Sequence, residues 1–281
     1  MTPGYSERIQ PLPGTTDRRN AFVTTVRTMN PWAELPASPP FILPDDRPRV
    51  LEYQTRSRPE NRLAVGCLPE PWVGNPITAT VIVLQLNPGY TPSDDDPLHA
   101  RSDYQALVRA SLLHQPLDYP FHYLDPRFAN SGGAKWCRRT NRWALEQLGD
   151  QVVAARLAHL EWFPYRSTKA GRLPRLASQA YSIDLLREAL KRDAVVIATR
   201  RIADWEAEVP ELVDYPRRLG TASQQQVALS PGNLTRGGSK TPEAFRMFIE
   251  ALTAPVASGV VPASWPEHRA RSGPGRGRGG P

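Results

Sequence analysis

Cysteine and long apolar runs are scarce in this chain, and each shortage excludes a class of protein. The 281 residues include two cysteines, Cys67 and Cys137, which cannot form a disulfide framework or by themselves complete a four-ligand zinc site. This cysteine usage indicates a reducing interior. The chain has no run of about 18 apolar residues, and its first residues lack the pattern of a signal peptide. We therefore expect a soluble, cytoplasmic protein without a membrane partner.

The spacings of common metal and nucleotide sites are also missing. The five histidines show no paired metal spacing. Residues 232–237 have the glycine spacing of a P-loop, but Gly238 stands where that motif requires lysine. The three aspartates at positions 94–96 could hold a hard cation, although adjacent side chains rarely point at one ion and a solvated acidic loop is the simpler interpretation. We expect neither a metal nor a cofactor.

Positive charge and proline, by contrast, are abundant. The net charge is +7 and the pI about 9.7, which allows a polyanionic partner. The 30 prolines concentrate near the two ends. We expect a Pro-rich, partly disordered N-terminal extension over residues 1–60 and a folded domain over 61–253. The Arg/Gly/Pro tail, 254–281, cannot bury enough apolar surface to fold, and it either attracts nucleic acid nonspecifically or only solubilises the chain.

Strand-like and helix-like patterns alternate between residues 60 and 253. Strands are predicted at Val81–Leu86 and over 157–163, 194–199 and 226–229, and helices over 103–114, 135–148, 178–191, 202–209 and 242–253. The alternation predicts a three-layer α/β domain around a central, mainly parallel, four-stranded sheet. Less regular parts are predicted as an extended wrapping segment (31–48), a short edge strand (62–67) and a polar loop (91–97).

Two turns with polar residues are predicted at the carboxyl ends of strands. Val81–Leu86 ends in Asn87-Pro88-Gly89, where proline removes a ladder donor and glycine permits unusual backbone angles. The strand predicted over 226–229 ends in a turn at residues 230–233. Open α/β sheets bind their ligands at this edge. Each turn alone is most simply a strand end, but if the strands are parallel neighbours both turns can face one cleft.

The two turns resemble the motifs of the uracil-DNA glycosylase superfamily. Val-Leu-Gln-Leu-Asn87-Pro88-Gly89 is similar to its first motif, most closely in the mismatch-specific and single-strand-selective branches. Ser230-Pro231-Gly232-Asn233-Leu234-Thr235-Arg236 resembles the second motif, an Asn/His-Pro-Ser loop followed by a residue that probes the duplex. The resemblance covers residues 78–253 and implies a uracil-DNA glycosylase-like fold and activity on DNA.

The resemblance also implies roles for particular residues, because breaking a base–sugar bond builds positive charge on the sugar and negative charge on the base. Asn87 matches the residue that positions the attacking water, and Ser230 lies where a residue stabilises the leaving base. Leu234 matches the wedge that fills the gap left by a flipped base. The other candidates contact the base or the DNA backbone: Gln85, Leu86, Pro88, Gly89, Tyr90, Phe128 and Asn233 for the base, and Lys135, Arg138, Thr235 and Arg236 for the DNA.

Departures from the superfamily pattern bear on the substrate. Gln85 replaces a glycine of the first motif and crowds the pocket wall. Ser230 stands where His or Asn is usual and stabilises an anionic base less well, which counts against ordinary uracil. Gly89 leaves the floor open where strict uracil enzymes carry a tyrosine that rejects bulky bases, which favours a larger base.

Glu161 is the most informative departure. Leu160-Glu161-Trp162-Phe163-Pro164 resembles the strand on which the family carries a base-reading asparagine three residues before a proline. An ionised glutamate can only accept hydrogen bonds, so it would prefer an amino group such as that of cytosine. The hypothesis is recognition of a modified or bulky cytosine-type base. The alternative is that Glu161 is paired with an arginine such as Arg166.

The sequence therefore predicts a monomeric, metal-independent DNA glycosylase. One alternative is a nucleic-acid-binding or sensing module that keeps the fold without the chemistry, which Ser230 and the missing glycine at position 85 favour. A weaker alternative is a metal-dependent phosphodiesterase that uses residues 94–96. The basic helix around Lys135 and Arg138 either neutralises phosphates or presents solvated arginines beside a core tryptophan, Trp143.

Overall fold

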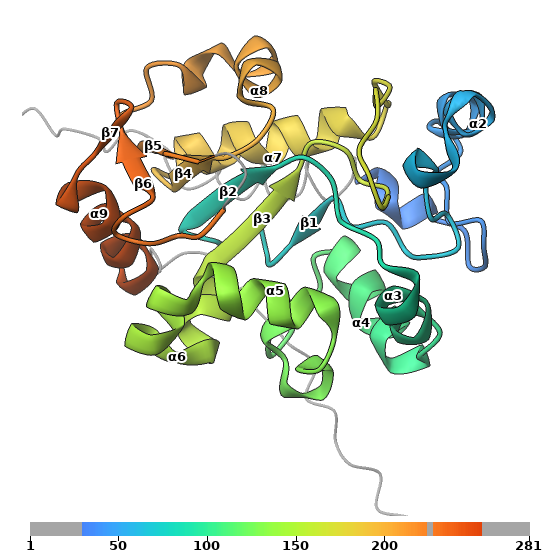
Figure 1. Ribbon diagram of the computed structural model, residues 1–281, viewed down its shortest axis with the longest axis horizontal. Coiled ribbons are helices and arrows are strands. Elements are labelled where there is room, and N and C mark those ends of the chain that lie inside the picture. The colour runs from blue at the N-terminus through green and yellow to red at the C-terminus, as the bar shows by residue number, and fades with distance from the viewer. Residues whose placement is uncertain (1–29, 224–226, 255–281) are drawn as a thin grey trace, which may run out of the picture.

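The computed structural model describes residues 30–223 and 227–254 (Figure 1). Its α-helices are α2 (Arg47–Arg56), α3 (Pro92–His99), α4 (Ser102–Leu112), α5 (Gly132–Thr140), α6 (Arg142–Arg156), α7 (Gln179–Lys191), α8 (Ile202–Glu208) and α9 (Pro242–Thr253). Its strands are β1 (Trp72–Val73), β2 (Val81–Gln85), β3 (Leu157–Glu161), β4 (Val195–Ala198), β5 (Arg218–Thr221), β6 (Leu234–Arg236) and β7 (Ser239–Lys240). Five 3-10 turns complete it: η1 (Pro31–Glu34), η2 (Pro59–Asn61), η3 (His122–Leu124), η4 (Pro126–Phe128) and η5 (Pro210–Leu212).

The sheet is mixed and has seven strands in the order β1-β3-β2-β4-β5-β6-β7. The four central strands, β3, β2, β4 and β5, are parallel to one another, while β1 and the pair β6 and β7 are antiparallel additions at the two edges. The predicted α/β class is confirmed. The predicted four-stranded sheet matches in three parallel strands, β2, β3 and β4. The short edge strands were not predicted, because they carry no periodic signal of their own.

Strand residues alternate between two cores, one on each face of the sheet. Val81 and Val83 of β2 lie in the core that α5, α6 and α9 cover, and Ile82 and Leu84 lie in the core on the opposite face. The strands β3 and β4 alternate in the same way. Because both faces are buried, the central strands are apolar at nearly every position, as expected for a parallel sheet.

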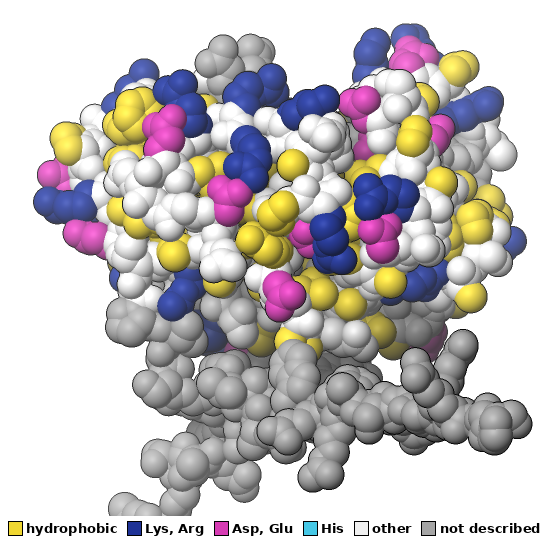
Figure 2. Space-filling view, turned by 90° about the horizontal axis from the view of Figure 1, so that it is seen from below, with side chains coloured by type: hydrophobic (Ala, Val, Ile, Leu, Met, Phe, Trp, Pro, Cys, Tyr) yellow, Lys and Arg dark blue, Asp and Glu magenta, His cyan; other side chains and the backbone are white. Residues whose placement is uncertain are grey.

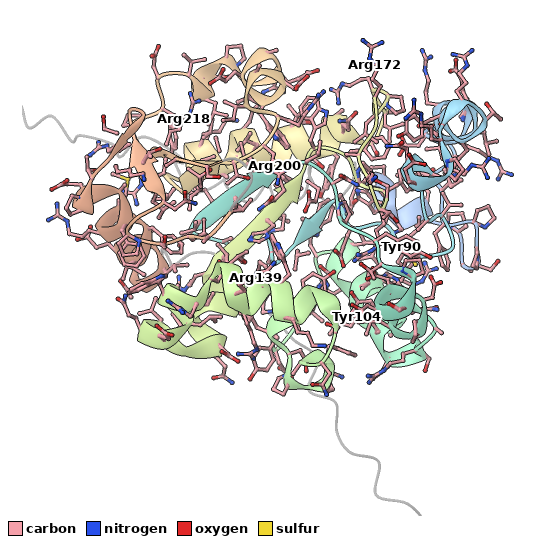
Figure 3. All side chains as sticks on the ribbon, in the orientation of Figure 1. Tyr90, Tyr104, Arg139, Arg172, Arg200 and Arg218 are labelled. Carbon is pink, nitrogen blue, oxygen red and sulfur yellow. The ribbon has the colours of Figure 1, made fainter. Side chains whose placement is uncertain are left out.

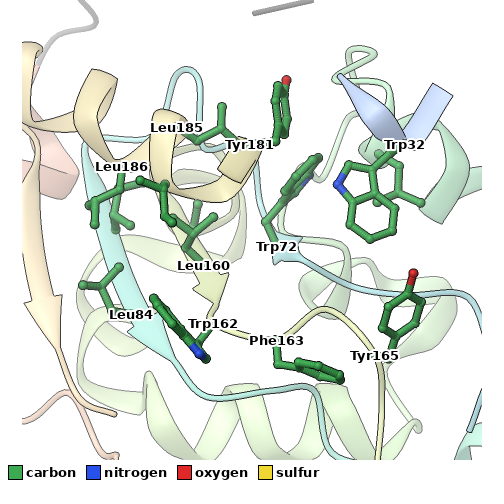
Figure 4. Packing of buried hydrophobic residues seen from close by; sticks show 14 of the residues in the cluster. Trp32, Trp72, Leu84, Leu160, Trp162, Phe163, Tyr165, Tyr181, Leu185 and Leu186 are labelled. Atoms are coloured by element: carbon green, nitrogen blue, oxygen red, sulfur yellow. The ribbon is translucent and has the colours of Figure 1, made fainter. Parts of the chain in front are cut away.

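The larger core contains an aromatic group next to β1 and β3, with Trp32, Trp72 and Tyr165 at its centre (Figure 4). Trp32 packs edge-on against Trp72, with ring centroids 6.3 Å apart. Residues 30–56 therefore belong to the folded body from Asn30 onward, as Asn30 Nδ2 also donates to the Leu112 carbonyl. The segment predicted as extended (31–48) wraps this core as expected, although it begins with η1 and its end enters α2.

Three local predictions are wrong. The residues 227–229 form no strand (Gln226 lies outside the described residues), and the fourth parallel strand is β5, whose Gly-containing sequence carries a weak strand pattern. Residues 62–67 form no strand, and Leu63 contributes one isolated bridge to Ser167. The polar segment 91–97 lies in α3, which begins with proline at an N-terminal position and has Asp94 and Asp95 in its first turn.

The predicted helices are present over most of their expected lengths. The basic helix predicted over 135–148 is two helices, α5 and α6, which meet at Asn141. The N-terminal arm up to residue 29 and the tail from residue 255 lie outside the described residues. Within the described ranges, no helix is long and apolar enough to cross a bilayer.

Gly74 directly follows β1 and lies close to the backbone of β3, so a substitution there tests how closely the two strands approach. Its φ is +91°, and a Cβ at this position would lie 2.3 Å from the Leu157 carbonyl oxygen. Gly149 has a φ of +77°, but a Cβ there would meet nothing within 4 Å. We expect Gly149→Ala to cost about 1–3 kcal/mol through backbone strain and Gly74→Ala to cost at least about 1–3 kcal/mol more through overlap. Denaturant unfolding of both variants measures the difference, and equal losses would contradict the tight approach.

Candidate active site

A pocket of about 890 Å³ lies at the carboxyl ends of β2 and β3. Along the chain, β2 is followed by β3 on one side and by β4 on the other, so the strand order reverses at β2. Open α/β sheets bind ligands in the crevice at this reversal. The turn after β2, helices α3 and α5, and the loop after β4 surround the opening.

The floor of the pocket carries three polar side chains on one face of the sheet. Gln85 on β2 pairs in register with Glu161 on β3, and His159 lies two residues before Glu161 on the same face. All three are at least nine-tenths buried. Gln85 Nε2 and Glu161 Oε2 have no hydrogen-bond partner among the described residues. Since buried polar groups are nearly always paired, these two atoms mark positions that a bound ligand would satisfy.

Burial decides the protonation state of Glu161. Removal from water raises its pKa well above the ordinary value, and the negative charge of Glu70 raises it further. Arg166 and Arg200 oppose this shift but do not reverse it. The direction of this shift favours the neutral acid, which can donate as well as accept, and counts against the ionised, acceptor-only Glu161 expected from the sequence. The alternative of an ion pair with Arg166 is wrong, because Arg166 pairs with Glu70 and Asp95.

Glu70 and Arg166 form a buried ion pair beside this floor. Arg166 Nη2 lies 2.7 Å from Glu70 Oε1, and both side chains are almost fully buried. Tyr123 and Tyr104 donate their hydroxyls to the Glu70 carboxylate, and His122 Nε2 lies 3.1 Å from it. Burial alone would raise the pKa of Glu70, but the Arg166 charge and the His122 contact hold it well below its ordinary value. Glu70 is therefore charged in the same pocket in which Glu161 is neutral.

The segment after β3 fixes the Asn87-Pro88-Gly89 turn. Arg166 Nη1 donates to the Gly89 carbonyl at 2.8 Å, and the Ser167 amide donates to the Pro88 carbonyl at 3.3 Å. Asn87 Nδ2 donates to Ser167 Oγ at 3.0 Å. These bonds orient the Asn87 amide at the pocket wall and bind the turn to the buried ion pair.

Two arginines border the pocket from opposite sides (Figure 3). Arg139 comes from α5 and is exposed, and Arg200 follows β4 and is half-buried, with its Nε lacking a partner among the described residues. Trp136 of α5 also lines the pocket and packs edge-on against His159. Figure 2, which views the molecule from below Figure 1, shows basic and acidic side chains interspersed with apolar ones on that face. Arg139 and Arg200 therefore place positive charge beside the pocket.

The first predicted motif lines the pocket as a unit. Gln85, Leu86, Asn87, Pro88 and Gly89 all contribute to the wall, and a Cβ added to Gly89 would meet nothing within 4 Å. The open floor expected at Gly89 is therefore consistent with the space around it. Tyr90 also lines the pocket, and its hydroxyl donates to Asp96 at 2.7 Å.

The second predicted motif does not join the first. Ser230 and Asn233 are absent from the pocket wall, where Val227 and Ala228 stand in their place. Asn233 holds its own turn by donating to the Ala228 carbonyl and accepting from the Ser223 amide. The expectation of two turns on one rim failed because it assumed a parallel strand over 226–229, and that strand does not exist.

Leu234 and Phe128 are not placed for their predicted roles. Leu234 is fully buried in β6 and packs in the core beneath α9, so it is not exposed as a wedge. Its neighbour Thr235 is also buried. Phe128 is 2% exposed, packs edge-on against Tyr104 and does not line the pocket, so it is not available to stack on a base.

The predicted DNA-contacting cations lie outside the pocket. Lys135 is exposed on α5, and Arg138 forms an ion pair with Asp150. Arg236 is exposed on β6 and donates to the Pro216 carbonyl. Trp143, considered above as a core residue, is 39% exposed and packs against Phe245.

The three aspartates at 94–96 act separately. Asp95 accepts from the Thr91 amide and faces Arg166, whereas Asp96 accepts from Tyr90. In the described ranges, no group of three or more His, Cys, Asp or Glu side chains is arranged to hold a metal ion. The arrangement therefore lends no support to the metal-dependent phosphodiesterase.

Sequence reasoning missed the residues that surround the floor: Glu70, Tyr123, Arg139, His159, Arg166 and Arg200. For His159 a signal existed, because a position two residues before Glu161 on a strand shares its face. No local signal joins Glu70 to Arg166, which are brought together only by the folding of distant segments.

Comparison of the chain with protein-family models, with curated proteins and with solved structures found no match in any of the three.

The Glu70–Arg166 pair predicts a large and pH-dependent contribution to stability. Arg166→Met leaves a buried carboxylate unpaired, and we expect a loss of about 3–5 kcal/mol in the free energy of unfolding. Adding Glu70→Gln should recover part of this loss. Arg49→Met, which breaks an exposed pair with Glu52, is the control and should cost at most about 1 kcal/mol. Equal losses for Arg166→Met and the control would contradict the buried pair.

The Glu70–Arg166 pair also predicts how the free energy of unfolding changes as the pH falls. The pKa of Glu70 in the folded protein lies below its ordinary value of 4.5, so the folded state binds the proton less well than the unfolded chain does. The stabilisation is complete above pH 4.5 and declines as the pH falls below it. Denaturant unfolding between pH 7 and pH 3 should show a steeper decline for the wild type than for Glu70→Gln, and parallel curves would contradict this.

Proposed function

We propose that this protein is a DNA glycosylase-like hydrolase that takes a flipped, non-standard base into the pocket at the carboxyl ends of β2 and β3. The observation that carries the proposal is the pair of unpartnered atoms, Gln85 Nε2 and Glu161 Oε2, on the floor of a pocket whose wall is the Asn87-Pro88-Gly89 turn. A planar heterocycle with donors and acceptors on its edge fits these groups. The base is a modified cytosine-type or otherwise non-standard one.

Asn87 is the residue that would place the attacking water. Its amide nitrogen is held by Ser167, so its orientation is fixed before the substrate arrives. A fixed polar group contributes to rate because its ordering does not have to occur during the reaction. Charge on the sugar develops next to this turn, while the departing base lies against the floor.

The pocket is large enough for a base that carries a substituent. Its volume is about 890 Å³, and space is open at Gly89. Arg139 and Arg200 at the rim would neutralise the phosphates on either side of the flipped nucleotide, which a single-stranded or duplex substrate equally provides.

A nucleic-acid-binding module of the same fold, without hydrolysis, is the second candidate. The displacement of Ser230 from the pocket favours it, because no residue of the second turn can then stabilise the leaving base. The two candidates differ in whether DNA becomes alkali-labile after incubation with the protein.

Asn87→Ala separates the two candidates. The full-length protein is incubated with a panel of duplexes and single strands, each with one modified base, and abasic sites are counted after alkali treatment. We expect the wild type to form abasic sites and Asn87→Ala to lose at least about 100-fold in rate with little change in DNA affinity. Asn61→Ala, a change outside the pocket, is the control. DNA that is bound but never made alkali-labile by the wild type would establish the binding module instead.

Gly89→Tyr tests the size of the base. The φ of Gly89 is not in the left-handed region, and open space surrounds it, so tyrosine can be introduced without strain. We expect the variant to lose activity on bases with a bulky substituent at the 5 position while it retains activity on small ones. Gly66→Tyr, also in open space but outside the pocket, is the matched control. An unchanged size preference would show that the base does not lie against Gly89.

A further inference from the structure

Resting on the function proposed above, we infer that Glu161 and Gln85 together read the edge of a cytosine-type base and that Glu161 gives its proton to the ring nitrogen N3 as the glycosidic bond breaks. An ionised glutamate could only accept hydrogen bonds, whereas this role requires a protonated Glu161 that donates.

The geometry of the floor presents two hydrogen-bond donors side by side. Gln85 and Glu161 are directly opposite each other in the parallel pairing of β2 and β3. Gln85 Nε2 can donate, and so can the neutral carboxyl of Glu161. Cytosine carries two adjacent acceptors, O2 and N3, next to a donor at N4. Uracil carries a donor at N3 between two acceptors. The neutral carboxyl could bind that edge only with its carbonyl oxygen toward N3, and it could not then give a proton to N3.

One cytosine-type base could make three hydrogen bonds with these two side chains. Gln85 Nε2 would donate to O2, and the Glu161 hydroxyl would donate to N3. The second oxygen of Glu161 would then accept from the N4 amino group. The base would satisfy both atoms that now lack a partner, Gln85 Nε2 and Glu161 Oε2, once these two side chains, whose end atoms are now buried, turn toward it.

The surrounding charges keep the carboxyl protonated until the base binds. Glu161 has no ion pair among the described residues, because Arg166 is occupied by Glu70, Asp95 and the Gly89 carbonyl. The groups facing it from the neighbouring elements are Glu70 before β1, Arg166 after β3, Arg200 after β4 and Arg139 on α5. His159 on its own strand is neutral, since burial lowers the pKa of that imidazole to about 3.

The O–H bond of Glu161 breaks and an N3–H bond forms, so the base leaves as a neutral molecule that takes the electron pair of the C1′–N1 bond. The oxygen of water bonds to C1′ and releases one proton to solvent, and solvent returns one proton to Glu161. Cytosine anions are poorer leaving groups than uracil anions, so a cytosine-type base needs this proton more. A positioned acid contributes about 10²–10⁴-fold in rate.

The test uses the full-length protein and compares base release from duplexes that carry 5-methylcytosine, 5-fluorocytosine or uracil at one position. Glu161→Gln keeps a donor and an acceptor but has no proton to transfer. We expect DNA affinity to change by only a few-fold, and release of 5-methylcytosine to fall about 10²–10⁴-fold. The loss should be smaller for 5-fluorocytosine, because fluorine stabilises the departing base. Glu146→Gln, an exposed change on α6, is the matched control.

A pH profile separates proton donation from a structural role. The wild-type rate should fall at high pH as Glu161 ionises, because the reaction requires its protonated form, and Glu161→Gln should lack this decline. If Glu161→Gln releases the cytosine derivatives at the wild-type rate with an unchanged profile while Asn87→Ala is inactive, the inference fails and the proposed function stands.

If the wild type releases no base from any substrate, the proposed function fails, and the edge contacts are judged by binding. Calorimetric titration then compares free cytosine with free uracil on the wild type, Gln85→Leu and Glu161→Leu. A preference for cytosine that both variants lose supports the edge contacts. Cytosine affinity that is equal in the wild type and in both variants overturns them.

Discussion

The ion pair between Glu70 and Arg166 is the interaction on which the site depends. A charged carboxylate and a guanidinium, both removed from water, are tolerable only when each is paired and hydrogen-bonded. The fold meets this requirement with groups from distant parts of the chain: Tyr104 on α4, His122 and Tyr123 in η3, and Asp95 on α3. Because Arg166 also donates to the Gly89 carbonyl, the turn at the end of β2 is fixed by the same interaction.

The pair has a second consequence for the neighbouring carboxyl. Arg166 is committed to Glu70, so Glu161 is left without a counter-ion and stays neutral, and the negative charge of Glu70 reinforces this. The pKa values of two glutamates in one pocket are therefore shifted in opposite directions. Environments that separate the pKa values of two carboxyls in this way are how enzymes divide acid and base roles between identical side chains. This division is the physical reason for considering Glu161 as a proton donor rather than an acceptor.

The position of the pocket follows from the topology of the sheet. The strand that follows β2 in the chain, β3, lies on one side of it, and the next, β4, lies on the other, so the strand order reverses at β2. The side chains at the strand ends, Gln85 and Glu161, are thus buried by the protein yet available to a ligand. The rim carries Arg139 and Arg200, and the space around Gly89 is open.

The sequence alone determined the features that depend on near neighbours along the chain. The apolar runs of β2, β3 and β4, the periodicity of α7 and α9, and the polar turn at Asn87 follow from local patterns, and the α/β class followed from their alternation. The tertiary structure decided what depends on distant segments. It replaced the strand expected over 226–229 with β5 and buried Leu234 in β6, since short edge strands are set by pairing with a partner rather than by their own residues. It also determined that Glu70 and not Glu161 pairs with Arg166, because the charge of a carboxyl depends on its burial and on the neighbours that folding brings to it.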